Sequence, residues 1–339
     1  MAEKRPKYSV IIPAFNEERA LARALEALAR SSFQDFEAIV VSDASTDATD
    51  DLARRAGVRL VRHEYRRGPA AARNTGAAAA SAEFLVFLDA DVVPELDWLQ
   101  RLDQQLTLRP DIRCFSGVYA DEPASEGWFQ RYRALLSYYY VADLPSCSAS
   151  TLLVTAVSGL ERSLFEAVGG FDETANAAHA EDTELGYRLG QLTQLYLLRD
   201  VRVRHEFPGL GVTFNNYFRR SAAWVRLFGR RRRFDNHTTT GRTALLRLVG
   251  AATALSHLLL LVAPRYWPVC LGAHVGYCLS NRRFVGFVAR RAPVAELPLM
   301  YVADLSLGLA VLAGAGAGAA SVLASALGIR ARLGSSFRT

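Results

Sequence analysis

Lysine is nearly absent from this chain of 339 residues: Lys4 and Lys7 are the only two, and every other basic residue is arginine. A mechanism that needs a catalytic lysine within the folded part of the chain is therefore excluded. Cysteine is also scarce, and the four cysteines have neither the spacing of metal ligands nor that of a disulfide framework. This cysteine usage favours a reducing compartment.

Acidic residues are scarce in the C-terminal part of the chain. Residues 207–339 contain 17 basic and 3 acidic side chains, a net charge of +14, whereas residues 1–206 contain 23 and 31, a net charge of −8. The length leaves room for two domains, and the reversal of charge indicates a boundary. We expect an α/β domain over residues 1–206, basic amphipathic connecting helices over 207–243 and apolar helices over 244–339.

An apolar run that ends in two carboxylates is the most informative segment. Residues 84–88 (FLVFL) are typical of a buried parallel strand, and Asp89 and Asp91 follow directly. Open α/β sheets bind ligands at the carboxyl ends of their strands, and hard divalent cations prefer oxygen ligands. The segment therefore predicts a site at which the two carboxylates bind a divalent cation and the cation binds a diphosphate. The alternative is that Asp91 only caps a helix over residues 94–108.

Polar residues also follow three earlier predicted strands. Residues 8–12 lead to Pro13, residues 36–42 lead to Asp43, and residues 58–61 lead to a loop and helix that contain Arg73. Ser45, Thr46 or Asp47 is expected to cap the helix after the second strand, whereas Asp43 lies too early for that role. We expect Asp43, Asp89 and Asp91 at one sheet edge, with Arg73 near enough to meet a phosphate or a carboxylate.

These motifs, in this order, resemble those of the family 2 glycosyltransferases. The resemblance covers residues 8 to about 205 and depends on segments 10–17 (VIIPAFNE), 42–47 (SDASTD), 68–74 (GPAAARN), 88–91 (LDAD), 169–173 (GGFDE) and 181–182 (ED). It implies a GT-A fold, an α/β domain with a mostly parallel sheet. The family usually has two aspartates at this point, and here the pair is Ser42-Asp43. The second position, which is generally assigned to the nucleotide base, is still an aspartate.

The resemblance also implies roles for individual residues. Asp43 would bind the nucleotide base, Asp89 the ribose or a metal ion, and Asp91 a Mg²⁺ or Mn²⁺ ion under the diphosphate. A UDP-sugar is the favoured donor, and the reaction would be an inverting hexosyl transfer. The full set expected to bind the donor is Pro13, Ala14, Asn16, Glu17, Asp43, Arg73, Asp89 and Asp91.

Asp182 is the candidate catalytic base. Residues 181–189 have helical apolar spacing, so Glu181 and Asp182 fall in a first turn, where the helix dipole favours an ionised carboxylate. Acidic residues are common in first turns without any catalytic task, which is the alternative. Glu181 is assigned to the acceptor side together with Gly170 and Phe171, whose turn ends a helix over residues 162–168. Because a phosphate acceptor needs no base, the acidic pair favours a hydroxyl acceptor.

Two histidines are considered near this site. His205 closes an alternating, strand-like segment and is a candidate metal ligand together with Asp89 and Asp91, or else an ordinary surface histidine. His179 lies just before the acidic pair and is a weaker candidate. The other histidines suggest no role by themselves.

The C-terminal part is expected to enter a membrane. Residues 245–263, 267–279 and 297–329 are largely apolar, and the last is too long for a single crossing, so it is expected to fold back. Residues 314–318 (GAGAG) could form that turn or a close helix-packing face. The arginine clusters indicate two hairpins with both termini inside. The alternative is an apolar domain lying in the membrane interface.

A basic aromatic segment, residues 214–228, is predicted to be an amphipathic helix that could rest on anionic lipid, and no nucleic acid partner is expected. No signal peptide precedes Tyr8, so the catalytic domain is expected on the cytoplasmic face of a bacterial-type inner membrane. The Gln-x-x-Arg-Trp signature of processive relatives is missing, and transfer of a single sugar to a lipid or lipid-linked saccharide is expected, in glycolipid or polysaccharide biosynthesis. The alternatives are a polyprenyl-phosphate sugar synthase, a haloacid-dehalogenase-type phosphatase and a catalytically silent membrane adaptor.

Overall fold

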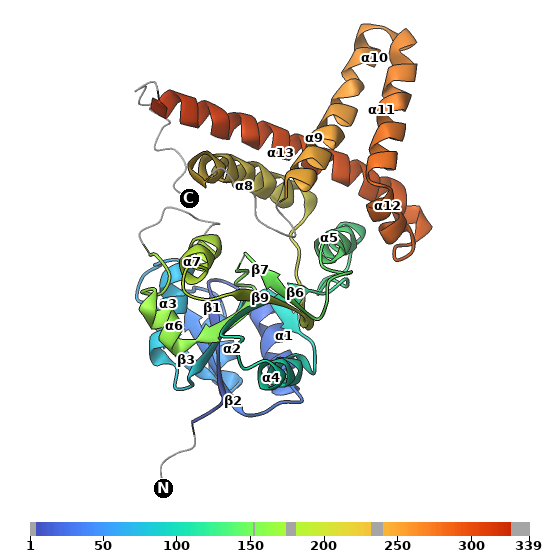
Figure 1. Ribbon diagram of the computed structural model, residues 1–339. Coiled ribbons are helices and arrows are strands. Elements are labelled where there is room, and N and C mark those ends of the chain that lie inside the picture. Colours follow the sequence, from blue (N-terminus) through green and yellow to red (C-terminus); the bar gives the residue numbers. More distant parts are fainter. Residues whose placement is uncertain (1–4, 152, 174–180, 232–239, 327–339) are drawn as a thin grey trace. The chain divides into compact units, whose positions relative to one another are not determined.

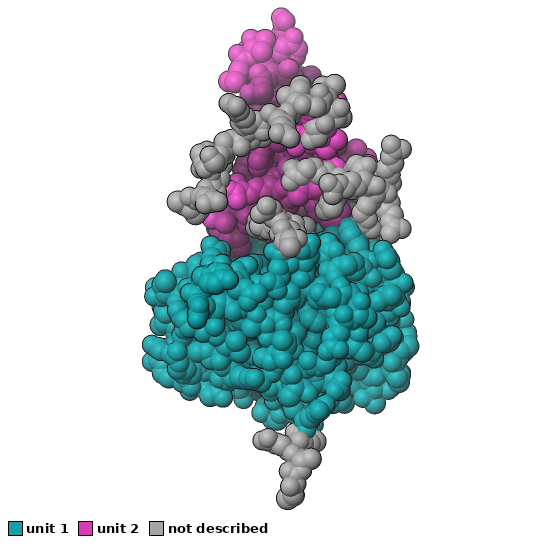
Figure 2. All heavy atoms as spheres, turned by 90° about the vertical axis from the view of Figure 1, so that its left-hand side faces the viewer, with its two compact units in different colours: residues 1–207 teal, residues 208–339 magenta. Residues whose placement is uncertain are grey.

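The computed structural model describes residues 5–151, 153–173, 181–231 and 240–326. Contacts divide the chain into two compact units, residues 1–207 and 208–339, which Figure 2 shows in two colours. His179 lies outside the described residues, as do Arg232, Arg233 and the chain after residue 326.

The first unit is built around one mixed β-sheet (Figure 1). In the described residues the strand order is β3-β2-β1-β4-β8-β6-β9-β5, with β7 also paired to β9. The strands are β1 (Tyr8–Ala14), β2 (Phe36–Ser42), β3 (Arg59–Arg62), β4 (Phe84–Leu88), β5 (Val92–Pro94), β6 (Cys114–Tyr119), β7 (Cys147–Ser150), β8 (Val157–Glu161) and β9 (Leu195–His205). The α/β class is confirmed, and parallel pairing is confined to β3-β2-β1-β4 and to β6 with β9.

Helices cover both faces of this sheet. The alternation of strand β1 sends Val10 and Ile12 to one face and Ile11 to the other. The first face packs against α1 (Glu18–Ala29), α2 (Thr49–Arg55) and α4 (Trp98–Leu108). The second packs against α3 (Pro69–Ala79), α6 (Arg162–Ala167) and α7 (Glu181–Leu189), and α5 (Trp128–Tyr139) follows β6. Gly76 lets α3 approach β1, because a Cβ atom there would lie 2.3 Å from Ile11 Cγ2.

Parallel pairing aligns the strand ends that carry the candidate residues. In β1 and β2, Ala14 pairs with Ser42, so both strands end at the same level. Strand β4 runs parallel to β1 on its other side. The segments after β1, β2 and β4 therefore emerge at one edge of the sheet, which is where the sequence predicted the site.

The second unit is helical in its described residues. Its elements are α8 (Leu210–Arg231), α9 (Gly241–Ser256), α10 (Leu258–Val262), η1 (Pro264–Tyr266), α11 (Trp267–Ser280), α12 (Arg282–Ala289), η2 (Val294–Glu296) and α13 (Leu297–Ala326). In the part that the structure describes, two segments are long and apolar enough to cross a membrane, Gly241–Val262 and Val294–Ala324. Helices α9 and α11 form a hairpin (Figure 1).

Helix α13 corrects the prediction that the last apolar stretch folds back. It is one continuous helix of 30 residues, about 45 Å long, so the second expected hairpin does not form. The glycines in it make a packing face instead. A Cβ atom on Gly314 would lie 2.2 Å from the carbonyl oxygen of Phe218, and one on Gly318 would lie 2.7 Å from that of Ala222. Helix α8 therefore packs backbone to backbone against α13.

The isolated charges of the apolar segments pair with each other. Arg247 of α9 donates a hydrogen bond to Asp304 of α13, which also accepts one from the hydroxyl of Tyr277 in α11. Asp304 is buried. Ionisable residues in apolar helices are stabilised when they pair with one another. Here α9, α11 and α13 each contribute one residue to such a group.

Candidate active site

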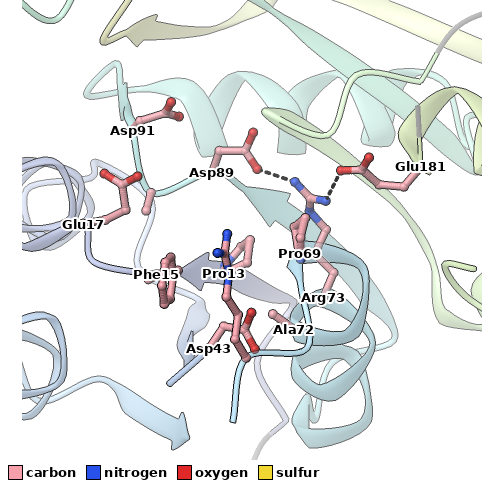
Figure 3. Close-up of a pocket in the computed structure, with 13 residues that line it drawn as sticks. Pro13, Phe15, Glu17, Asp43, Pro69, Ala72, Arg73, Asp89, Asp91 and Glu181 are labelled. Carbon is pink, nitrogen blue, oxygen red and sulfur yellow. Dashed lines mark hydrogen bonds and ion pairs between the residues drawn. The ribbon is translucent and has the colours of Figure 1, made fainter. Parts of the chain in front are cut away.

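A cavity of about 300 Å³ lies at the sheet edge formed by the ends of β1, β2 and β4. Figure 3 shows the side chains that surround it. Its lining residues are Pro13, Ala14, Phe15, Glu17, Asp43, Arg66, Pro69, Ala72, Arg73, Asp89, Ala90, Asp91 and Glu181. All predicted donor-binding residues except Asn16 belong to this lining.

Asn16 connects two loops instead of lining the cavity. Its backbone adopts a left-handed conformation with φ of 55°, which asparagine tolerates. Its side-chain oxygen accepts a hydrogen bond from the backbone N–H of Thr46 (2.8 Å), and its own N–H donates to Ser45 Oγ (3.1 Å). These contacts tie the loop after β1 to the loop after β2. Asn16 therefore shapes the cavity from outside.

The side-chain cap expected on helix α2 comes from Asp47, which lies one residue before the N-cap position. The N-cap residue is Ala48, which has no capping side chain. Asp47 accepts hydrogen bonds from the backbone N–H groups of Thr49 (3.0 Å) and Glu18 (3.1 Å), at the starts of two helices. Burial opposes ionisation, but these hydrogen bonds hold the pKa of Asp47 below its usual range. The polar cluster thus fixes both helix starts beside the cavity.

Three carboxylates, those of Glu17, Asp89 and Asp91, gather at one end of the cavity (Figure 3). Burial, with repulsion from Asp89 and Glu17, raises the pKa of Asp91 to about 7. Burial, with repulsion from Asp47 and Asp89, also raises the pKa of Glu17. Among the described residues, the Oδ1 atom of Asp91 is buried and has no hydrogen-bond partner. The group is therefore electrostatically suited to a cation.

Asp91 does not cap a helix, which was its alternative role. Residues Val92–Pro94 form β5, and helix α4 begins only at Trp98 with Asp97 at its N-cap. Strand β5 pairs with β9 so that Val92 lies opposite His205. This register brings His205 Nε2 to 3.4 Å from Asp91 Oδ2.

The ring of His205 is held between two aromatic side chains. Its centroid lies 4.7 Å from that of Tyr119 and 4.5 Å from that of Phe207. Its side chain is 14% exposed. The ring is therefore held near Asp91 in a partly buried position.

Arg73 lies between two acidic side chains. Its side chain is 5% exposed, and its guanidinium donates to Asp89 (2.7 Å) and Glu181 (3.2 Å), as Figure 3 shows. The same group lies 5.4 Å from the ring centroid of Phe171. Arg73 therefore meets carboxylates, and it connects the end of β4 to the start of α7.

The acidic pair on α7 splits between two environments. Glu181, assigned to the acceptor side, lines the cavity, whereas Asp182 is not among the lining residues. Asp182 lies in the first turn of α7 and accepts a hydrogen bond from the backbone N–H of Thr183 (2.6 Å).

The glycine turn on the acceptor side is fixed by α3. Gly169 and Gly170 both have positive φ angles and follow the end of α6, as predicted. Asn74 of α3 accepts a hydrogen bond from the N–H of Phe171 (2.9 Å) and donates to its carbonyl oxygen (2.9 Å). The turn is therefore held next to the helix that carries Arg73.

Sequence reasoning missed several residues at the site. Phe15 and Arg66 both line the cavity, and the guanidinium of Arg66 lies 4.1 Å from the ring centroid of Phe15. Phe15 lies within the first motif, so its position could have been inferred. His63 contacts Asp43 from behind the cavity wall, and no local pattern marks it.

The mixed sheet, the helices on both faces and the acidic cavity at the strand ends define a GT-A fold. A solved structure with this fold is the mannosyltransferase PcManGT from Pyrobaculum calidifontis, in complex with GDP-Man and Mn²⁺. It covers 93% of this chain and 88% of its own, with a TM-score of 0.56 and 20% identity. At this identity the likeness concerns the fold alone.

Residues 9–169 match the model of the family described as Glycosyl transferase family 2. This part of the chain is therefore similar to a family 2 glycosyltransferase domain, and the match favours that class over the haloacid-dehalogenase alternative. The chain is 32% identical over 194 residues to the pre-mycofactocin glycosyltransferase of Mycobacterium tuberculosis, covering 53% of this chain and 38% of the relative. It is 35% identical over 92 residues to a Campylobacter jejuni GalNAc(5)-diNAcBac-PP-undecaprenol beta-1,3-glucosyltransferase, covering 25% of this chain and 30% of the relative. The chain thus spans well under half the length of these relatives.

Proposed function

We propose that the chain is a metal-dependent, inverting glycosyltransferase that moves one sugar from a nucleotide-diphosphate sugar to a hydroxyl acceptor. The observation that carries this proposal is the cavity in which Asp43 lies with the carboxylates of Glu17, Asp89 and Asp91. One cavity would thus hold both a group that binds the nucleotide base and a group that binds a cation. These two groups match the base and the diphosphate of such a donor. The family match of residues 9–169 supports the same reaction class.

The residues present fit a divalent cation. The buried Oδ1 of Asp91 has no hydrogen-bond partner, and the pKa of Asp91 is raised by burial and by two nearby carboxylates. Asp91, Asp89 and His205 would hold the ion. The described residues contain no ready-made group of three acidic, histidine or cysteine ligands, so donor phosphate oxygens would complete the set, as they do for Mg²⁺. A bound Mg²⁺ or Mn²⁺ would supply charge neutralisation to the diphosphate leaving group.

The remaining roles in binding and catalysis are assigned to side chains of the protein. Asp43 accepts a hydrogen bond from the nucleotide base. Arg73 orients Asp89 and Glu181, which it binds on both sides. Asp182 takes the proton from the acceptor hydroxyl as the hydroxyl attacks the sugar. One displacement inverts the configuration at the reacting carbon.

We propose a lipid or lipid-linked saccharide as the acceptor. Two helices that are long and apolar enough to cross a membrane support this choice, as does the undecaprenol-linked substrate in the name of the Campylobacter jejuni relative. The catalytic unit would work at the cytoplasmic face of the inner membrane. A polyprenyl phosphate is the other acceptor to test, and since it is already an anion, transfer to it would not need Asp182.

The test uses full-length protein in detergent with a panel of nucleotide sugars and with lipids extracted from membranes. We expect Mn²⁺-dependent release of the nucleotide and labelling of a lipid. Asp91→Ala should reduce turnover at least about 100-fold, consistent with lost electrostatic stabilisation of the leaving group. Asp111→Asn, which changes an exposed residue paired with Arg109, is the control and should retain normal turnover. Equal turnover with and without divalent cation would contradict the metal assignment.

A further inference from the structure

Two histidines of the second unit bring ring nitrogens together in the apolar hairpin. His257 lies between α9 and α10, and His274 lies in α11, the other arm of the hairpin (Figure 1). The Nε2 atoms of the two rings are 3.3 Å apart. Neither residue lines the cavity at the sheet edge. Ionisable side chains in apolar helices are costly and mark functional sites by default, so the pair calls for a role of its own.

The spacing of the two nitrogens is that of two ligands on a tetrahedral ion. Zn²⁺ binds imidazole nitrogen at about 2.0–2.1 Å in tetrahedral geometry, which places two such nitrogens about 3.3–3.4 Å apart. Ligands at right angles, as in octahedral or square-planar sites, would lie about 2.9 Å apart at the same bond length. The ring centroids are 5.0 Å apart, with an interplanar angle of 77°. Two imidazoles that share a tetrahedral Zn²⁺ would have centroids about 5.2 Å apart, whereas two rings in line across the same gap would lie farther apart.

Each ring is oriented by a partner on its other nitrogen, as metal-binding histidines usually are. Nδ1 of His257 lies 3.2 Å from the carbonyl oxygen of Ala254. A carbonyl only accepts, so this Nδ1 carries the proton and a lone pair remains on Nε2. Nδ1 of His274 contacts the hydroxyl of Tyr301 in α13. Because a hydroxyl can donate or accept, Nδ1–H of His274 can donate to Tyr301, which leaves a lone pair on its Nε2 as well.

We propose that His257 and His274 bind a Zn²⁺ ion that connects α9 to α11. Imidazole is a good ligand for Zn²⁺, whereas Mg²⁺ prefers oxygen, so this site and the carboxylate cavity select different ions. The described residues contain no group of three acidic, histidine or cysteine ligands, so water would fill the other two positions. The inference goes beyond the proposed function and does not depend on it, because the pair lies in the other unit.

The ion can reach the pair from water. His257 is exposed, and it lies about 8 Å along the chain of helices from Val262, where the apolar segment ends. That depth is well short of the middle of a hydrocarbon layer about 30 Å thick. With two protein ligands instead of four, the site should bind Zn²⁺ more weakly than a closed structural site.

The experiment is equilibrium dialysis of full-length protein without a histidine tag, in detergent, against Zn²⁺. The difference between the wild type and His274→Gln counts the ions bound by the pair, because the two proteins share every other site. We expect a difference of about one ion per chain, and the same difference for His257→Gln. Co²⁺ in place of Zn²⁺ reports the geometry, since tetrahedral Co²⁺ absorbs visible light far more strongly than octahedral Co²⁺. The wild type should show this absorption, and both variants should lose it.

A tyrosine pair tests the orientation of His274. Tyr301→Phe removes the oxygen on Nδ1 and should weaken Zn²⁺ binding at least about tenfold. Tyr266→Phe is the matched control, because Tyr266 belongs to the same hairpin and its ring lies against Arg265 instead. This control should bind Zn²⁺ like the wild type. Equal affinities in the two variants would contradict the role of Tyr301.

Two results would overturn the proposed zinc site. The first is equal Zn²⁺ binding by the wild type and both histidine variants, which would leave the two rings as a hydrogen-bonded pair. The second is a wild type in which Co²⁺ gives only the weak absorption of octahedral coordination. If His274→Gln does not fold, His257→Gln, at the exposed member of the pair, still decides the matter. Neither result would touch the proposed glycosyl transfer.

Discussion

Arg73 is a buried cation that pairs with two of the acidic side chains of the cavity. Burial disfavours its charge, but Asp89 and Glu181 hold its pKa above the usual range. Its two partners lie on different elements, the end of β4 and the start of α7. The residue therefore stabilises the fold and the site at once.

Replacing Arg73 with leucine should strongly destabilise the first unit. The change removes a buried cation and leaves Asp89 and Glu181, which are partly buried, without their shared partner; the loss should approach about 3–5 kcal/mol of unfolding free energy. Denaturant unfolding of the full-length protein in detergent, followed by tryptophan fluorescence, measures this cost. Arg113→Leu removes a partly exposed ion pair with Glu161 and should cost below about 1 kcal/mol. Equal losses in the two variants would contradict the account of Arg73.

Asp182→Asn tests the proposed catalytic base. The amide cannot take a proton, so transfer to a hydroxyl acceptor should fall about 100-fold or more, while donor binding stays unchanged. Single-turnover assays and donor titration measure the two properties separately. Glu184→Gln, which changes a nearby residue of α7 paired with Arg188, is the matched control. Normal transfer by Asp182→Asn would remove the base assignment and favour a phosphate acceptor.

Helices α8 and α13 show how small residues set the distance between helices. Gly314 and Gly318 lie against the backbone of α8 at Phe218 and Ala222, whereas Gly316 has no neighbouring atom within 4 Å of the position a Cβ atom would take. Glycines four residues apart fall on one face of a helix, which lets two backbones approach closely. The glycine-rich segment is thus an interface, and its regular spacing serves packing.

Adding a single methyl group distinguishes the two sides of this helix. Gly314→Ala puts a Cβ atom 2.2 Å from the Phe218 carbonyl oxygen and should lower stability by about 1–3 kcal/mol through overpacking. Gly316→Ala should leave stability unchanged or raise it slightly, because alanine is the better helix former. Thermal unfolding in detergent, monitored by circular dichroism, compares the two. Equal midpoints would show that the close contact does not matter for stability.

The chain as a whole combines an acidic α/β unit with a basic, apolar helical unit. Its two apolar segments, Gly241–Val262 and Val294–Ala324, are joined by an ion pair between Arg247 and Asp304. Such pairing lowers the cost of placing charged residues in a hydrocarbon layer. The composition and this pairing together favour insertion over surface binding.

Extraction of membranes with alkaline carbonate tests this prediction. An inserted protein stays in the pellet, whereas one held by basic residues on anionic lipid dissolves when its electrostatic contacts are lost. We expect the full-length chain in the pellet, both at pH 11 and in high salt. Complete release into the supernatant would support the interfacial alternative.

The sequence alone determined the first four strands, β1 to β4, and the order of the acidic side chains that follow them. Apolar runs such as residues 84–88 can only be buried, and the carboxylates that follow them must emerge at the strand ends. The helix after Gly68 and the glycine turn at Gly169 were likewise evident, because local backbone preferences decide them.

Only the tertiary structure decided which side chains meet. Arg73 and Glu181 are 108 residues apart, and Arg247 and Asp304 are 57 apart, so no periodic pattern connects them. The same holds for His63, which only the pairing of β2 with β3 brings to Asp43. Helix α13 is one continuous helix that packs against α8 and α9, and packing of that kind depends on the whole fold rather than on any local segment.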